Sequence, residues 1–218
     1  MVAHRDLRFC QQLNDPFWRG KLEPDLFRRL GIEQRQRLGR DANLDAALPR
    51  RIRTQGCIGS SAVYDSANNI MTVFGGENVA RDTFTNGVWT LSHANGLGGT
   101  PQWTNIVADG APGSPAKRWY HSAVYDIANN RMTIFGGGAF SGPASISGFN
   151  DVWVLANANG LGGSPIWTKL ATTGLKPGPR AGHTAVYDAV NNRMMVFGGE
   201  NADAVYYVTW VLSHANGL

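Results

Sequence analysis

One long motif occurs three times along this chain at an almost constant spacing. This repeat restricts the folds that the chain can adopt. The tyrosine of the motif recurs after 61 residues and then after 62, and a glycine pair keeps the same steps. A supersecondary unit repeated in this way buries its apolar face against its neighbours. We therefore expect a repeat protein. The copies read SSAVYDSANNIMTVFGG from Ser60, HSAVYDIANNRMTIFGG from His121 and HTAVYDAVNNRMMVFGG from His183.

Each copy predicts a β-hairpin followed by further strands. The run AVYD alternates side chains as a strand does, Asp-x-x-Asn-Asn supplies a turn whose asparagines tolerate positive φ, and the next apolar run predicts a second strand. After the glycine pair come a third strand with a tryptophan, a polar connector and, in two copies, a fourth strand with a second tryptophan. We expect structural roles for the recurring residues, which are Gly75, Gly76, Trp89 and Trp103, then Gly136, Gly137, Trp153 and Trp167, then Gly198, Gly199 and Trp210.

This pattern resembles the kelch repeat. The resemblance is carried by the apolar run closing on a double glycine (MTVFGG, MTIFGG and MMVFGG) and by the two spaced aromatic residues after it. It is also carried by Arg-x-x-His at the start of the next copy, at Arg118 with His121 and at Arg180 with His183. The resemblance implies an all-β fold, namely an incomplete kelch-type β-propeller of about two and a half to three four-stranded blades.

The repeats also predict how the chain is divided. Residues 1–55 are expected to form a basic, partly helical or disordered leader, and 56–218 to hold the blades, at 56–117, 118–179 and, incomplete, 180–218. Propellers close with about four to eight blades. We therefore expect a fragment of a longer protein, or alternatively self-association of copies that together complete a ring.

The basic charge of the chain belongs to the leader. Residues 1–55 hold 12 of the 20 Lys and Arg but only 7 of the 16 Asp and Glu. The run LEPDLFRRLGIEQRQRL predicts a short helix from Pro24 to Gly31. Nucleic-acid binding by this segment is a minor hypothesis, because recognisable motifs of such binders are missing. No apolar stretch has membrane-spanning length, so we expect no membrane partner. The sequence does not indicate in which cellular compartment the protein works.

The repeated polar residues predict structure rather than chemistry. His121 and His183 stand at equivalent places without a nearby carboxylate or cysteine, so hydrogen bonding is expected rather than a metal site. Arg118 and Arg180 are expected to pair with acids or backbone carbonyls. The aspartate before each turn recurs in every copy, as a turn-capping role predicts. We expect no catalytic residues and no cofactor.

The loops between the second and third strands differ between copies, and the kelch resemblance implies that such loops form a recognition face. They read ENVARDTFTNGV, GAFSGPASISGFNDV and ENADAVYYVT. The sequence therefore predicts a binding or scaffold module that contacts a protein or carbohydrate ligand through its blade loops. The alternative is part of a galactose-oxidase-like propeller enzyme with a copper or carbohydrate-related site, although neither Cys10 nor Cys57 stands where that family's cysteine does. The candidate contact residues are Arg81, Asp82, Phe84, Phe140, Tyr206 and Tyr207.

Overall fold

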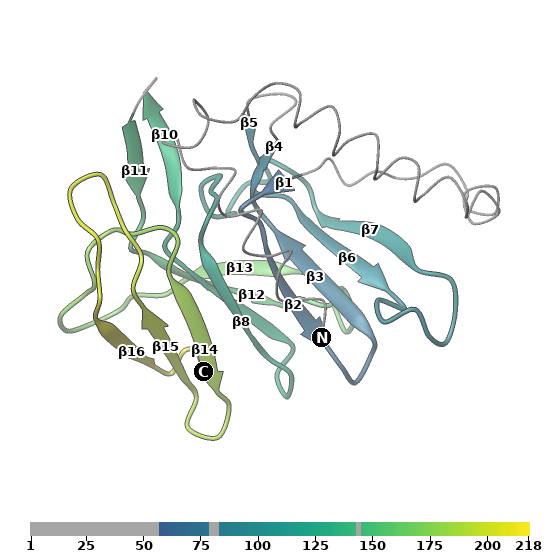
Figure 1. The fold of residues 1–218 in the computed structure, drawn as a ribbon. Coiled ribbons are helices and arrows are strands. Elements are labelled where there is room, and N and C mark those ends of the chain that lie inside the picture. Colours follow the sequence, from purple (N-terminus) through teal and green to yellow (C-terminus); the bar gives the residue numbers. More distant parts are fainter. Residues whose placement is uncertain (1–56, 79–82, 143–144) are drawn as a thin grey trace, which may run out of the picture. The chain divides into compact units, whose positions relative to one another are not determined.

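The structure is a computed structural model that describes residues 57–78, 83–142 and 145–218, with side chains for all of these except 57 and 140–146. Every regular element within these ranges is a β-strand, which confirms the all-β class for this part of the chain (Figure 1). The described ranges contain no helix of membrane-spanning length and apolarity. The leader at 1–55 and its expected helix lie outside the described residues.

Three antiparallel sheets follow the three copies of the motif. Sheets 1 and 2 have four strands each and sheet 3 has three, all in sequence order from the first strand outward. Sheet 1 contains β2 (Ser61–Asp65), β3 (Ile70–Phe74), β6 (Val88–Ser92) and β7 (Gln102–Val107). Sheet 2 contains β8 (Ser122–Asp126), β9 (Arg131–Phe135), β12 (Val152–Ala156) and β13 (Ile166–Lys169). Sheet 3 contains β14 (Thr184–Asp188), β15 (Arg193–Phe197) and β16 (Thr209–Ser213).

The loops between second and third strands contain short strands that the sequence patterns did not predict. β4 (Glu77–Asn78) pairs with both β1 (Cys57–Ile58) and β5 (Thr83–Phe84). β10 (Gly138–Gly142) and β11 (Ser145–Gly148) form a separate hairpin. These loops differ in length and composition between the copies. The repeat pattern therefore does not predict strands within them.

The turn between the first two strands is held by the aspartate that ends the first strand. Asp65 accepts hydrogen bonds from the backbone N–H groups of Ala67 (3.0 Å) and Asn68 (3.2 Å) and from the Asn68 side chain (2.8 Å). Asn69 completes the turn with a φ of 54°. Asp126 and Asp188 bond their own turns in the same way, which confirms the predicted capping role.

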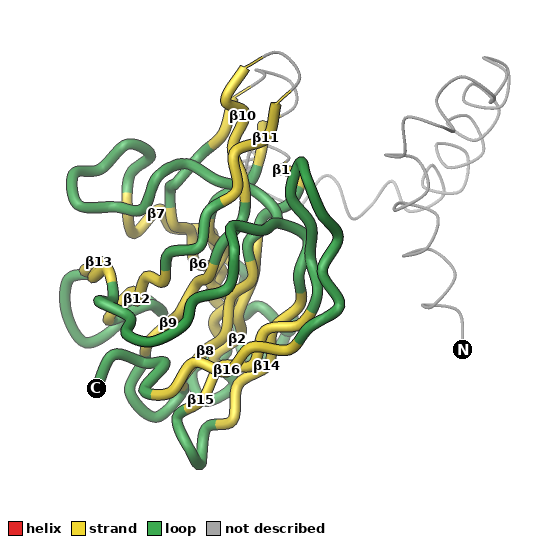
Figure 2. Tube along the Cα trace, turned by 90° about the vertical axis from the view of Figure 1, so that its left-hand side faces the viewer, coloured by secondary structure: helices red, strands yellow, loops and turns green. Residues whose placement is uncertain are grey.

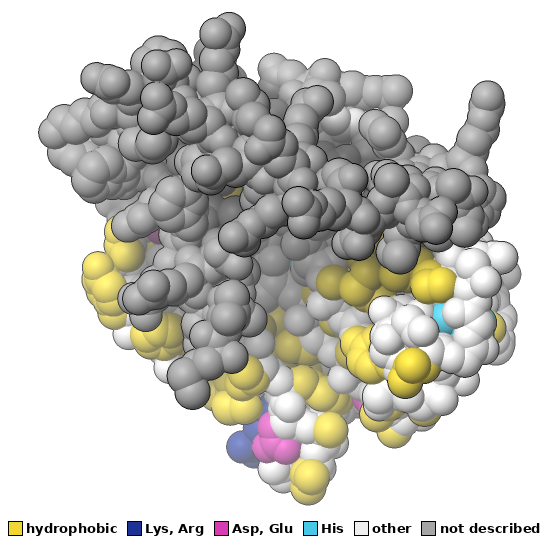
Figure 3. Space-filling model, turned by 45° about the vertical axis from the view of Figure 1, so that its right-hand side comes forward, with side chains coloured by type: hydrophobic (Ala, Val, Ile, Leu, Met, Phe, Trp, Pro, Cys, Tyr) yellow, Lys and Arg dark blue, Asp and Glu magenta, His cyan; other side chains and the backbone are white. Residues whose placement is uncertain are grey.

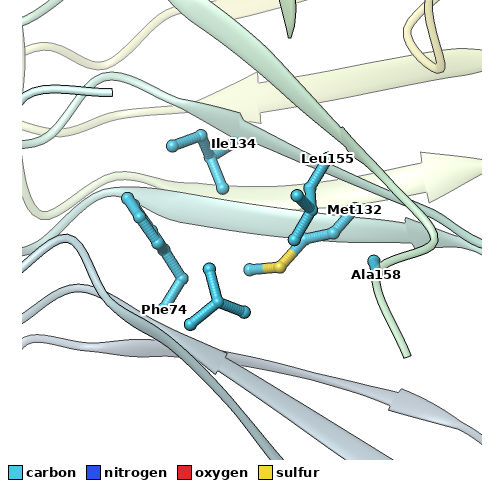
Figure 4. Packing of buried hydrophobic residues seen from close by; sticks show 6 residues of the cluster. Phe74, Met132, Ile134, Leu155 and Ala158 are labelled. Carbon is cyan, nitrogen blue, oxygen red and sulfur yellow. The ribbon is translucent and has the colours of Figure 1, made fainter. Parts of the chain in front are cut away.

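The sheets pack side by side through apolar clusters. The first strands β2, β8 and β14 are neighbours in that order, as Figure 1 also shows. Figure 2 shows the same strands in the turned view, where they overlap. Between sheets 1 and 2, a buried cluster combines Phe74 and Val88 with Met132, Ile134, Leu155 and Ala158 (Figure 4). Between sheets 2 and 3, the buried cluster contains Val124, Phe135, Val152, Met194, Val196 and Ala215. Alternate residues of β9 thus serve opposite faces, so sheet 2 is covered on both sides.

A polar clamp joins each sheet to the connector of the next. Asn159, in the connector of sheet 2, donates its side-chain amide to Asp65 Oδ2 (2.7 Å), and Thr72 Oγ1 donates to the carbonyl of Ala158 (2.8 Å). The same two bonds link sheets 2 and 3, from Asn216 to Asp126 (2.6 Å) and from Thr133 to Ala215 (2.7 Å). Burial alone would raise the pKa of Asp65, but the hydrogen bonds from Asn159 and Asn68 hold it below its usual value.

We expect Asn159→Ala to destabilise the protein by about 2 kcal/mol, because it leaves the buried Asp65 carboxylate without one of its donors. The control is Ser66→Ala, in the turn of sheet 1, where the side chain is exposed. That change should cost less than about 1 kcal/mol. Urea unfolding of both variants measures the difference, and equal losses would show that the clamp adds nothing between sheets.

Candidate binding face at the loop end of the sheets

The segments that enter the three first strands are bonded to one another in a row. Tyr120 N–H donates to the carbonyl of Gly59 (2.8 Å), and Gly182 N–H donates to the carbonyl of Tyr120 (2.9 Å). These three residues occupy equivalent positions of the copies. The loops between second and third strands leave the sheets at this same end, which we call the loop end (Figure 1).

The glycine pairs let neighbouring repeats approach closely at the loop end. A Cβ on Gly75 would lie 2.9 Å from both His121 Cε1 and the Arg118 carbonyl oxygen, at a φ of 69°. A Cβ on Gly136 would lie 2.8 Å from His183 Cε1 and 2.9 Å from the Arg180 carbonyl oxygen. The first glycine of each pair therefore receives the histidine of the next copy, which explains why both motifs occur together.

The two histidines form hydrogen bonds, as predicted, and the structure also places them in the interior. His121 Nε2 lies 2.6 Å from Ser61 Oγ, and His183 Nε2 donates to the carbonyl of Phe135 (3.1 Å). Burial lowers the pKa of His121 to about 3 and that of His183 to about 4, so both rings are neutral at pH 7. Within the described residues, no group of three or more His, Cys, Asp or Glu side chains is placed to hold a metal ion.

The arginines of the motif are also engaged as predicted. Arg118 is fully buried and donates to the carbonyls of Ala116 (3.0 Å) and Gly136 (2.9 Å). Its Nη1 and Nη2 contact both carboxylate oxygens of Asp151, at 2.7 and 3.2 Å. The Phe149 ring lies beneath the guanidinium, with 4.3 Å from Cζ to the ring centroid.

Arg180 repeats this arrangement without the carboxylate. It donates to the carbonyls of Gly178 (3.1 Å) and Gly198 (2.9 Å), and its Cζ lies 4.0 Å from the centroid of Tyr206. Val208 takes the position of Asp151, since its carbonyl likewise accepts from the first glycine of the pair. In sheet 2 Asp151 also accepts from Trp153 Nε1 (2.8 Å), whereas the buried Trp210 Nε1 has no hydrogen-bond partner.

We expect Val208→Asp to stabilise the protein by about 1–2 kcal/mol, because the new carboxylate would accept from both Arg180 and Trp210. Chemical denaturation at pH 7 measures the gain. Val205→Asp is the control, because Val205 is similarly exposed, at 56% against 50% for Val208. A Val208→Asp variant no more stable than this control would contradict the assigned equivalence.

An aromatic cluster at the loop end was not predicted from the sequence. The Trp119 ring lies 4.5 Å from Tyr120 and 5.7 Å from Phe84, measured between ring centroids. Tyr120 has a φ of 48°, where the equivalent residues are Gly59 and Gly182. The signal was present, because Trp119-Tyr120 replaces the small residues Ala181-Gly182 of the third copy. We call Phe84, Trp119 and Tyr120 the aromatic cluster.

The other predicted contact residues have different surroundings. Arg81 and Asp82 lie outside the described residues. Phe140 lies in β10, where its backbone pairs with Ile146, and its side chain is not described. Tyr206 lies against Arg180 and accepts a hydrogen bond from the Asn201 side chain (2.9 Å). Tyr207 is 79% exposed, which leaves most of its ring available to a ligand.

A pocket between sheets 2 and 3 is too small for a metabolite-sized ligand. Its volume is about 70 Å³, and its walls include Phe135, Val152, Met194 and Trp210. Ligand pockets usually measure about 300–1,000 Å³. The described surface in Figure 3 instead carries many hydrophobic and uncharged side chains and few charged ones.

No family model matches the sequence. Among solved structures, that of YjhT is similar to this chain, with 21% sequence identity and a TM-score of 0.47 over 66% of this chain. The match covers 35% of YjhT, so the chain spans about a third of the length of that structure.

Proposed function

We propose that the three sheets are blades of a kelch-type β-propeller, and that the chain is a binding or scaffold module that contacts its ligand at the loop end. The arrangement of the sheets supports the first part. Their first strands are neighbours, their faces pack through apolar clusters, and equivalent polar bonds join both pairs of sheets. Repeats that contact only their neighbours in this way are typical of propeller blades.

The aromatic cluster is the observation that carries the binding function. The repeated aspartates, histidines and arginines serve equivalent contacts in successive copies. Trp119 and Tyr120 differ from them because they break the repeat, standing where the third copy has Ala181 and Gly182. A non-glycine residue at positive φ costs about 1–2 kcal/mol. Tyr120 retains this strain where glycine would not, which favours a role for its ring outside the fold.

The chemistry of the loop end suits a protein or carbohydrate ligand. Aromatic rings supply large, rigid apolar faces, and Tyr adds a hydroxyl group that bonds polar ligand atoms. The repeats hold 8 Lys and Arg against 9 Asp and Glu, so they offer no excess of positive charge for a phosphate backbone. Self-association to complete a ring remains a separate prediction.

The test is a screen of the whole chain against a phage-displayed peptide library and an array of glycans, followed by affinity measurements on the best binder. Trp119→Ala should weaken binding at least about 10-fold, as truncation of an aromatic anchor does. The matched control is Leu97→Ala, in an exposed connector at the opposite end of sheet 1, which should leave the affinity within about 2-fold.

Tyr120→Gly separates binding from folding. We expect weaker binding with unchanged or higher stability, because glycine adopts this φ without strain. A binder whose affinity is insensitive to both Trp119→Ala and Tyr120→Gly would contradict the proposed site.

A further inference from the structure

The outer face of sheet 3 carries one half of an interface that the chain uses twice. Phe74 and Phe135, which face the next sheet from sheets 1 and 2, are 0% and 4% exposed. Phe197 stands at the equivalent position of sheet 3 and is 53% exposed. Val124 is 6% exposed, whereas its equivalent Val186 is 59% exposed. Side chains that are core residues in two sheets are therefore surface residues in the third.

The polar half of the clamp is present on this face as well. Asp188 matches Asp65 and Asp126, and it bonds Asn191 of its own turn as they bond theirs. Where Asp65 and Asp126 also accept from the connector asparagine of the next sheet, no described connector reaches Asp188. Arg193 matches Arg131, which donates to the carbonyl of Asn216 (3.0 Å) across the second interface.

The first glycine of the third pair, Gly198, also lacks the close neighbour that its equivalents have in the other two sheets. A Cβ on Gly198 would meet only the Tyr206 carbonyl oxygen, at 3.5 Å. The corresponding atoms on Gly75 and Gly136 would lie within 2.9 Å of the next histidine. Met195 replaces the threonine of the clamp, so one hydrogen bond of the earlier interfaces is exchanged for an apolar contact.

The complementary half lies on sheet 1. Its connector holds Ala94 and Asn95, which match Ala158 and Asn159 of the first interface. Asn159 and Asn216 are each 4% exposed, but Asn95 is exposed. Tyr64 matches Tyr125, which packs against the first cluster, and is 44% exposed. The donor of this clamp, Asn95, is therefore exposed on sheet 1, and its acceptor, Asp188, is partly exposed on sheet 3, so the two halves lie on opposite outer sheets of one chain.

We infer that the outer face of sheet 3 binds sheet 1 of a second copy of this chain. In this contact Asn95 of one copy donates to Asp188 of the other, while Phe197 and Val186 are covered. The contact joins two different faces of the chain. Two copies can therefore form a closed ring in which sheet 3 of each copy binds sheet 1 of the other. Two copies provide six sheets, within the range of about four to eight for closed propellers. The inference goes beyond the proposed function, because it needs no ligand at the loop end.

Light scattering of the purified chain between about 1 and 200 μM tests the contact, because a dissociation constant within this range changes the mean mass across it. We expect the mass to rise from 23.6 kDa to twice that value. Val186→Arg should weaken association at least about 10-fold, since it places a charge in an apolar contact. Val190→Arg, in the adjacent turn and 94% exposed, should leave association unchanged.

A charge exchange tests the register. Asn95→Asp places two carboxylates together and should dissociate the pair, and adding Asp188→Asn should restore it, since the amide and carboxylate have then changed places. A mass that stays at 23.6 kDa would overturn the inference. A larger mass that Val186→Arg leaves unchanged, or a double variant that stays dissociated, would overturn it as well. Ligand binding sensitive to Trp119→Ala would stand or fall separately.

Discussion

Acidification from pH 7 to pH 5 should destabilise the protein by about 2 kcal/mol for each of His121 and His183. Burial holds the pKa of these residues at about 3 and about 4, against 6.5 for an unperturbed histidine. Below pH 6.5 the unfolded chain therefore binds protons that the folded chain does not, and stability falls as the pH falls towards 4. Urea unfolding at a series of pH values measures the effect.

The aspartates add little to this change in stability between pH 7 and pH 5. The pKa of Asp65, Asp126 and Asp151 is held below the usual 3.8, so the stability they supply is lost only below about pH 4. A variant with His121→Gln and His183→Gln should lose most of the dependence between pH 7 and 5. Equal unfolding free energies of the natural chain at these two pH values would contradict the burial of the histidines.

Gly136→Ala should destabilise the protein by about 3 kcal/mol or more. The new Cβ would meet two groups that cannot move aside easily: the Arg180 carbonyl oxygen at 2.9 Å, and His183 Cε1 at 2.8 Å. The His183 ring is fixed by its bond to the Phe135 carbonyl. A left-handed φ of 64° adds a further cost for any residue with a Cβ. Thermal and urea unfolding measure the loss.

Gly182→Ala separates the two causes. Gly182 has a similar φ of 68°, but a Cβ there would meet nothing within 4 Å. We expect a loss of only about 1 kcal/mol, since the equivalent position already accommodates Tyr120. If both alanine variants lose the same amount, the glycine pair serves backbone conformation alone and not the approach of the next sheet.

The repeat predicted most of the local structure. The alternation in AVYD, the turn at Asp-x-x-Asn-Asn and the strand before each glycine pair all occur where the pattern places them, because these signals act over a few residues. The hydrogen-bonding role of His121 and His183 and the pairing of Arg118 followed from their equivalent positions in successive copies, whereas the burial of the histidines was not predicted.

Contacts between repeats could not be predicted from the same signals. Asn159 bonds Asp65 across 94 residues, and only the packed sheets bring them together. The turn pattern correctly places Asp65 in its own turn, but nothing in the sequence indicates that its second carboxylate oxygen bonds the neighbouring sheet. The loops raised a different difficulty, because they share no period. Phe84 was selected for its loop, yet its contact Trp119 lies in a segment treated as part of the repeat.

The central claim is that successive sheets pack against one another through their apolar faces. Nuclear Overhauser contacts of methyl-labelled methionines test it most directly. We predict contacts from the Met132 methyl group to the Phe74 ring, and from Met194 to Phe135, because each pair shares a buried cluster although its members belong to different sheets. Methionine methyl groups that contact only residues of their own sheet would contradict the claim.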